Sequence, residues 1–159
     1  MTRPVRTVCC VRKRPLDRRT PQWLTAVMSE TAITGIHHVT LSVSDLDRSV
    51  EWYVRVLGFR ELRRLNHNGL DKAMLTRDGV VVTFVCHGEA AVPGPFDERR
   101  SGLDHLSFAV ADRPALDAWV ARLDEHGVVH SDIVSGATGD LVPFRDTDNI
   151  ALEFYTRPA

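Results

Sequence analysis

One sequence motif occurs twice in this chain, and the repeat limits the folds that the chain can adopt. Residues 35–45 read GIHHVTLSVSD, and residues 102–112, which begin 67 positions later, read GLDHLSFAVAD. A second pair closes each copy, with RDGVVVTFV at 77–85 and TDNIALEFY at 147–155. Self-similarity at a fixed spacing indicates one structural unit used twice.

Each copy begins with a strand that leads into a helix. In the first copy Val39, Leu41 and Val43 alternate with polar residues, which is the period of a strand with one buried face. Asp45 then stands where it can cap a helix, whose apolar residues follow at three- and four-residue spacing until Gly58. The second copy repeats this order, with Asp112 as the cap, Pro114 in the first turn and an end before Gly127. Trp52 and Trp119 stand at equivalent places on the two helices and are expected in the core.

Three further strands are expected after each helix. The predicted ranges are 59–66, 71–77 and 79–87 in the first copy, with a turn at Asp78–Gly79, and 128–134, 140–145 and 149–156 in the second. The prediction is an α+β protein with two tandem βαβββ modules that form a curved mixed sheet around a cup. Residues 31–159 make up this domain, with module one at 34–87, a linker rich in glycine and proline at 88–101, and module two at 102–156.

The first 30 residues differ from the rest in charge. They hold seven of the 20 basic residues and two of the 21 acidic ones, so residues 31–159 carry 13 basic and 19 acidic side chains, a net charge of −6. We interpret 1–30 as a disordered extension or as sequence upstream of a true start at Met28; a transit peptide or a basic tail is the alternative. An acidic folded part argues against nucleic acid as a partner. No apolar run suggests a membrane span, and three cysteines without a disulfide pattern suit the cytoplasm.

Two histidines occupy the same position in the repeated strands. His38 and His105 both point, by alternation, away from the face that the helix covers. Glu153 alternates with Leu152 and Phe154 in the last strand, so its carboxylate also lies on the polar face. A lone histidine on such a face is usually solvated, but a matched pair with a carboxylate is typical of a facial triad for a divalent metal. The three side chains converge in one cup if the modules lie edge to edge, and iron, manganese, nickel, cobalt or zinc would suit them.

The chain resembles the vicinal oxygen chelate superfamily, also called the glyoxalase, bleomycin-resistance and extradiol-dioxygenase superfamily. The resemblance covers residues 34–156 and rests on HHVTLSVSDLDRSVEWYVRVLGF, GLDHLSFAV and FRDTDNIALEFY, in which Thr147 replaces a frequent proline. In that family, paired βαβββ modules form a cup around a divalent metal held by residues of the first and last strands. The resemblance implies His38, His105 and Glu153 as the ligands of this chain.

One position departs from the lactoylglutathione lyases of the superfamily. By the internal repeat Thr83 is the counterpart of Glu153, whereas those lyases have a glutamate there that acts as ligand and base. The three-ligand pattern is more similar to extradiol dioxygenases and to thiol-transferring fosfomycin-resistance enzymes. The two-module length is more similar to the latter, although the cluster of lysine, serine and tyrosine around their phosphonate is not found.

Several other polar residues are expected near the cup. His87 shares the polar face of the last strand of module one, as a general acid/base or as a solvated strand-end histidine. Tyr155 either orients a substrate hydroxyl or stands at the rim without a role. Arg145 either binds a substrate carboxylate or forms a surface ion pair, and PFDERR at 95–100 either covers the cup or contacts a partner subunit. Surface positions are expected for three further histidines, which are His67, His126 and His130.

These observations favour a metal-dependent enzyme acting on a small substrate with adjacent oxygen atoms. Isomerisation, lyase chemistry, ring-cleaving oxygenation and thiol transfer to an epoxide all remain open. The alternative is a metal-free binding protein of the bleomycin-resistance kind, a class that tends to lose the ligand triad, and a third possibility is a member that binds metal without turnover. The resemblance also implies a homodimer, with the cup within one chain or across two.

Overall fold

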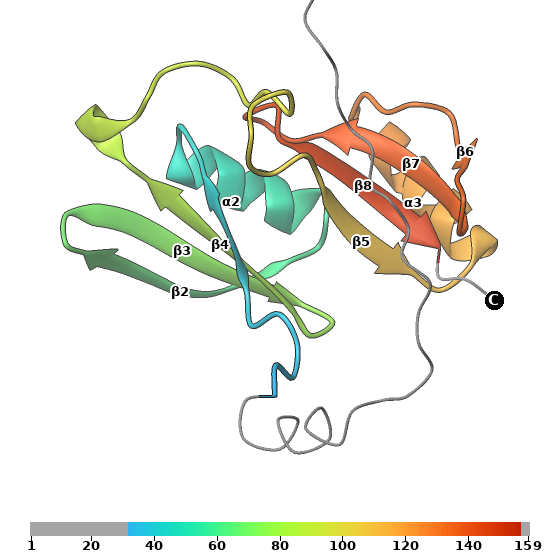
Figure 1. Cartoon of the computed structure of the whole chain (residues 1–159), viewed down its shortest axis with the longest axis horizontal. Coiled ribbons are helices and arrows are strands. Elements are labelled where there is room, and N and C mark those ends of the chain that lie inside the picture. Colours follow the sequence, from blue (N-terminus) through green and yellow to red (C-terminus); the bar gives the residue numbers. More distant parts are fainter. Residues whose placement is uncertain (1–31, 157–159) are drawn as a thin grey trace, which may run out of the picture. The chain divides into compact units, whose positions relative to one another are not determined.

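The structure, a computed structural model, describes residues 32–156, so the extension at 1–30 lies outside the described residues. Both modules lie in one compact unit that begins at Ile36, and Figure 1 shows each as a sheet with a helix. Module one contains β1 (Val39–Ser42), α2 (Leu46–Arg55), β2 (Arg60–His67), β3 (Leu70–Arg77) and β4 (Val80–Cys86). A 3₁₀ turn, η1 (Gly88–Ala90), lies in the linker. Module two contains β5 (Leu106–Val110), α3 (Arg113–Glu125), β6 (Val134–Ser135), β7 (Asp140–Arg145) and β8 (Ala151–Thr156).

The predicted βαβββ order is confirmed in both modules. Each sheet is mixed, because its first strand pairs in parallel with its last, and the other pairs are antiparallel. The strand orders are β1-β4-β3-β2 and β5-β8-β7-β6. The register is repeated as well, with Thr40 opposite Thr83 in module one and Ser107 opposite Glu153 in module two.

The local signals for the helices are also confirmed. The carboxylate of Asp45 accepts a hydrogen bond from the Arg48 backbone N–H at 3.0 Å, and Asp112 accepts one from that of Ala115 at 2.9 Å. These bonds satisfy donors that have no partner within the first turn of a helix. Just after the end of α2, Gly58 adopts a φ of +67°, a left-handed conformation that L-residues rarely adopt.

The strand predicted at 128–134 is wrong in its extent. There the chain makes an isolated bridge from His130 to Phe144 and the two-residue strand β6. Pro143 accounts for the interruption, because its carbonyl accepts from the Ser131 backbone N–H at 3.1 Å but its nitrogen has no hydrogen to donate on that side. His130 was predicted at the surface, but only 14% of its side chain is exposed. Its ring nitrogens form hydrogen bonds with the Ser131 carbonyl and with the Asp124 carboxylate.

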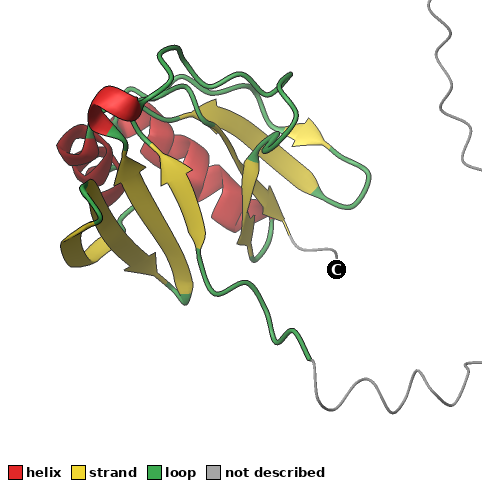
Figure 2. Cartoon of the chain, turned by 60° about the vertical axis from the view of Figure 1, so that its left-hand side comes forward, coloured by secondary structure: helices red, strands yellow, loops and turns green. Residues whose placement is uncertain are grey.

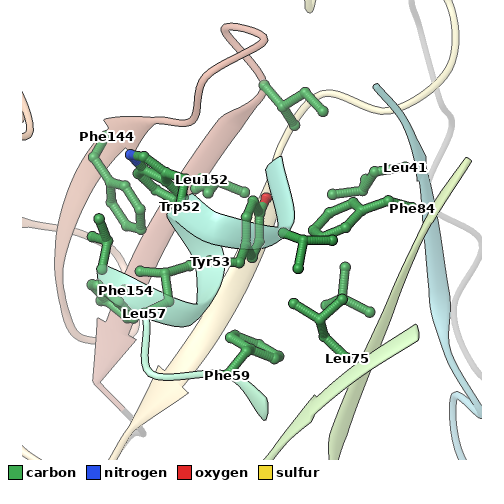
Figure 3. Packing of buried hydrophobic residues seen from close by; sticks show 14 of the residues in the cluster. Leu41, Trp52, Tyr53, Leu57, Phe59, Leu75, Phe84, Phe144, Leu152 and Phe154 are labelled. Atoms are coloured by element: carbon green, nitrogen blue, oxygen red, sulfur yellow. The ribbon is translucent and has the colours of Figure 1, made fainter. Parts of the chain in front are cut away.

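One apolar core joins the two modules. Trp52 on α2 stacks on Phe144 of β7 with ring centroids 6.5 Å apart, and Tyr53 contacts Phe84 of β4 at 4.7 Å. Figure 3 shows these helix side chains between apolar residues of the two sheets, and Figure 2 shows the helices against them. Trp119 stacks on Phe154 at 4.2 Å, so both tryptophans pack as expected. Because both sheets turn their apolar faces to this core, their polar faces point away from it.

Candidate metal centre

His105 and Glu153 come together on the polar face of module two. Parallel pairing places Glu153 opposite Ser107, and His105 precedes Ser107 by two residues, so both side chains leave the sheet on one face. The His105 Nε2 and Glu153 Oε1 atoms are 3.4 Å apart. Glu153 is 9% exposed, and the two residues line a pocket of about 530 Å³.

A second carboxylate orients the imidazole. Asp104 Oδ1 lies 2.7 Å from His105 Nδ1, which favours the tautomer with its proton on Nδ1 and leaves the Nε2 lone pair facing Glu153. A histidine held by an outer carboxylate, with a buried glutamate oxygen beside its free nitrogen, is a donor set that suits a divalent metal ion. These residues therefore fit the metal that the sequence predicts.

His38 lies on the polar face of module one, apart from this pair. Its Nδ1 atom is 2.8 Å from that of His37, and the side chain is exposed. Within residues 32–156, no group of three or more histidine, cysteine, aspartate or glutamate side chains is close enough to share a metal. The shared core explains this separation, because it lies between the polar faces that carry His38 and His105.

Thr83 stands beside His38 as Glu153 stands beside His105. The registers Thr40–Thr83 and Ser107–Glu153 are equivalent, and the histidine precedes the first member of each pair by two residues. Thr83 is 7% exposed, and its Oγ1 atom is buried without a hydrogen-bond partner. Buried hydroxyls are normally paired. Module one thus has a histidine and an unpartnered hydroxyl where module two has a histidine and a carboxylate.

The two predicted catalytic residues lie in different surroundings. His87 follows β4, and its Nε2 atom is 3.1 Å from Ser42 Oγ. It lines a pocket of about 590 Å³ next to the linker, which shares no lining residue with the pocket of His105 and Glu153. The Tyr155 hydroxyl accepts from the backbone N–H and side-chain hydroxyl of Thr138, at 3.4 and 3.2 Å.

Arg145 forms the ion pair that was one of its two predicted uses, and the linker supplies the partner. Nη1 and Nη2 of Arg145 donate to the two carboxylate oxygens of Glu98 at 3.1 and 2.9 Å. These bonds lower the pKa of Glu98 to about 2. Both residues line the pocket of His105 and Glu153. Sequence reasoning placed Arg145 and the 95–100 segment near the cup but gave no sign that they pair.

Two aspartates of the closing FRDTDN run connect the modules by hydrogen bonds, a role that the sequence did not predict. Asp146 accepts from the Tyr53 hydroxyl at 3.1 Å and from the backbone N–H of Ile150 at 2.8 Å. Asp148 accepts from the Ser44 backbone N–H at 3.1 Å and from Arg48 at 2.8 Å. Burial raises the pKa of Asp146 above its ordinary value. The network fastens the turn before Glu153 to the start of α2 in the other module.

Comparison with known proteins agrees with this architecture. The family model of the Glyoxalase/Bleomycin resistance protein/Dioxygenase superfamily matches residues 35–154. A crystal structure of a glyoxylase/bleomycin resistance protein/dioxygenase domain from Frankia sp. EAN1pec superposes with a TM-score of 0.73 at 35% sequence identity, over 79% of this chain and 93% of that one. Among the described residues, no helix has the length and apolar character needed to cross a membrane.

Two curated relatives carry different activities in their names. A catechol-2,3-dioxygenase of Bacillus subtilis (strain 168) is 29% identical over 124 residues, which are 77% of this chain but 41% of the dioxygenase. A metallothiol transferase FosB of Shouchella clausii (strain KSM-K16) is 30% identical over 130 residues, 78% of this chain and 81% of the transferase. The chain therefore spans less than half of the dioxygenase and most of the transferase.

Proposed function

Because the chain belongs to the glyoxalase/bleomycin resistance protein/dioxygenase superfamily, we propose that it is a metal-dependent enzyme for a small substrate with two adjacent oxygen atoms. The observation that carries the proposal is the 3.4 Å approach of His105 Nε2 to Glu153 Oε1, with Asp104 behind the ring. A bound divalent ion supplies Lewis-acid polarisation of the substrate oxygens. The names of the relatives support ring-cleaving oxygenation and thiol transfer as candidate reactions.

We propose that His38 of a second copy completes the site. His38 is exposed on the polar face of its own sheet, away from the core that joins the modules. A two-fold dimer that brings the polar face of module one against that of module two in the partner would place two imidazoles and a carboxylate together, once in each of two equivalent sites. The proposed enzyme is therefore a homodimer whose sites are shared between chains.

His87 and Tyr155 have distinct proposed roles in this site. His87 lies at the end of β4 beside Ser42, on the face that carries His38, and would transfer a proton to or from the substrate. Tyr155 follows Glu153 by two residues on the same face. Because its oxygen accepts from Thr138, its own hydrogen is available to a substrate hydroxyl.

The first test is the metal content of the full-length protein by elemental analysis. We expect near-stoichiometric divalent metal in the parent and its loss in His38→Ala, His105→Ala and Glu153→Ala, with circular dichroism unchanged. His67→Ala, which removes an exposed histidine of β2, is the matched control and should retain the metal. A parent protein that neither contains metal nor takes up iron, manganese, nickel, cobalt or zinc would contradict the proposal and favour metal-free binding of a small molecule.

Mixing two inactive variants tests whether the site is shared. After His38→Ala and His105→Ala are unfolded and refolded together, half of the dimers would contain one chain of each kind, with both substitutions in one site and an intact second site. Metal content should then recover to about one quarter of the parent value. No recovery in mixed dimers of confirmed composition would place all ligands within one chain.

A further inference from the structure

Arg145 lies in the same pocket as His105 and Glu153 but on a neighbouring strand. In the pairing of β7 with β8 it stands opposite Ala151, two residues before Glu153. Its side chain is 40% exposed, and it brings a guanidinium group into a pocket that also holds the carboxylates of Glu98, Asp104 and Glu153. A cationic fork therefore lies beside the proposed metal ligands.

Glu98 occupies this fork in the geometry of a bound carboxylate. Two parallel hydrogen bonds join its oxygens to Nη1 and Nη2 of Arg145, and such paired bonds are how arginine recognises carboxylates. Because the pKa of Glu98 is about 2, its carboxylate stays ionised at any working pH. Glu98 therefore marks a position that suits the carboxylate of a ligand.

The attachment of the linker allows Glu98 to leave while Arg145 stays in place. The backbone carbonyl of Asn149 accepts from Arg145 Nη1 at 3.1 Å, which orients the guanidinium independently of Glu98. The linker is fixed two residues earlier, at Phe96. Its carbonyl accepts a hydrogen bond from Asn149 Nδ2 at 3.0 Å, and its backbone N–H donates to the Asp148 carbonyl at 3.3 Å. Glu98 itself is partly exposed and lies outside any helix or strand, and exposed ion pairs of this kind contribute little stability.

We propose that Arg145 binds a carboxylate group of the substrate, and that Glu98 holds this position until the substrate displaces it. The inference rests on the proposed function, since it assigns a substrate class to that site: small molecules with two adjacent oxygens and a separate carboxylate. Displacement of Glu98 also frees the linker after Phe96, so that substrate binding and the position of residues 97–100 are coupled.

The test compares two ligands that differ by one carboxylate. Catechol and 3,4-dihydroxybenzoate are titrated by calorimetry, without oxygen, into the full-length protein loaded with Mn²⁺. We expect 3,4-dihydroxybenzoate to bind more tightly than catechol by roughly tenfold, as paired charge-assisted hydrogen bonds imply. Arg145→Gln should remove this preference, whereas Glu98→Gln should raise the affinity for 3,4-dihydroxybenzoate alone.

Arg113→Gln is the matched control, because Arg113 bonds two carboxylates of module two, Asp117 and Asp140, yet does not line this pocket. It should retain the preference. An Arg145→Gln protein that still prefers 3,4-dihydroxybenzoate, or a Glu98→Gln protein that binds both ligands less tightly, would overturn the inference even when metal is bound.

A third ligand separates this inference from the proposed function. Benzoate has a carboxylate but no adjacent oxygens, and it is titrated into protein stripped of metal. Binding that Arg145→Gln abolishes and Glu98→Gln strengthens supports the carboxylate site whether or not elemental analysis finds a metal. Equal benzoate binding in the parent and in Arg145→Gln would contradict it while leaving the metal proposal untouched.

Discussion

The two modules have the same backbone register but different side chains beside their histidines. In module two His105 has the carboxylate of Glu153 at 3.4 Å, whereas in module one the equivalent neighbour of His38 is Thr83. Strand order, helix caps and pairing are common to both, so the duplicated scaffold tolerates either residue. The difference teaches that the backbone places a histidine at the same position in both modules, and that one neighbouring side chain decides whether a carboxylate stands beside it.

The helices of the two modules also differ in what they bury. Trp52 on α2 is 9% exposed and stacks on Phe144 of the other module. The equivalent Trp119 on α3 packs on Phe154 of its own module, with the Arg77 guanidinium 4.6 Å above the ring. Both helices therefore contact the other module, α2 through an apolar aromatic stack and α3 through the Arg77 guanidinium.

The largest expected effect comes from truncating the two tryptophans. Trp52→Ala should lower the free energy of unfolding by about 3–5 kcal/mol, since it removes an aromatic side chain from the shared core. Trp119→Ala should cost less, because this side chain is only partly buried. Urea unfolding monitored by circular dichroism measures both. Equal losses in the two variants would remove the distinction between the helices.

A second substitution makes module two resemble module one. Glu153→Thr removes the carboxylate of the proposed ligand and should weaken metal affinity by at least about 100-fold, because even outer residues of metal sites contribute 10–100-fold. Competition with a coloured chelator measures the change. Thr83→Glu added to Glu153→Thr should restore metal binding only if a carboxylate at either position can serve. Unchanged metal affinity in Glu153→Thr would remove Glu153 from the proposed ligand set.

The hydrogen bond between Tyr53 and Asp146 joins the two modules, and removal of the Tyr53 oxygen atom breaks it. Tyr53→Phe should cost roughly 1–2 kcal/mol, because it removes a buried hydrogen bond and leaves a carboxylate oxygen with one partner fewer. Ser49→Ala, which removes a longer contact to Asp148 of 3.4 Å in the same network, is the comparison and should cost less. The free energy of unfolding in urea distinguishes them.

The same buried carboxylate gives a pH dependence of definite sign. Burial raises the pKa of Asp146 above 3.8 in the folded protein, so this group contributes stability that is present below its unfolded pKa and is lost as the pH rises through its folded value. The wild type should therefore lose stability relative to Asp146→Asn as the pH rises above about 4. Thermal melts of both proteins from pH 3.5 to 7 measure the difference, and parallel curves would contradict the assignment.

The smallest effect concerns Thr83. Thr83→Val replaces the unpartnered hydroxyl with a methyl group of similar size and should stabilise the metal-free protein by roughly 1 kcal/mol. Thr40→Val, which changes its exposed neighbour on β1, is the matched control and should change stability little. A loss of stability in Thr83→Val would mean that the hydroxyl has a partner in solution.

Local signals explain why much of this fold could be predicted. The caps at Asp45 and Asp112 and the side-chain parity of His105 and Glu153 depend on neighbours a few residues away, and all are found as expected. Parity fixes the face of a sheet but not what covers it. The sequence therefore allowed His38 to join His105 and Glu153, whereas the core between the sheets holds it apart from them within one chain.

The contacts that were missed all join distant parts of the chain. Glu98 meets Arg145 across 47 positions and Tyr53 meets Asp146 across 93, and no periodicity or spacing encodes such pairs. The strand predicted at 128–134 failed for a related reason, because the residue that interrupts its pairing is Pro143, on the partner strand.

Pro143 has a consequence for how this protein behaves at high concentration. Strand edges with free donors and acceptors let copies add to one another and grow into fibrous aggregates. At the outer edge of module two, β6 offers two residues, and the neighbouring stretch of β7 lacks a donor at Pro143. The outer edge of module one is β2, where Arg60, Arg63 and Arg64 are exposed and the register shifts at a bulge. At the β6 edge a missing backbone N–H group hinders the addition of a strand from another copy. At the β2 edge exposed positive charge does so.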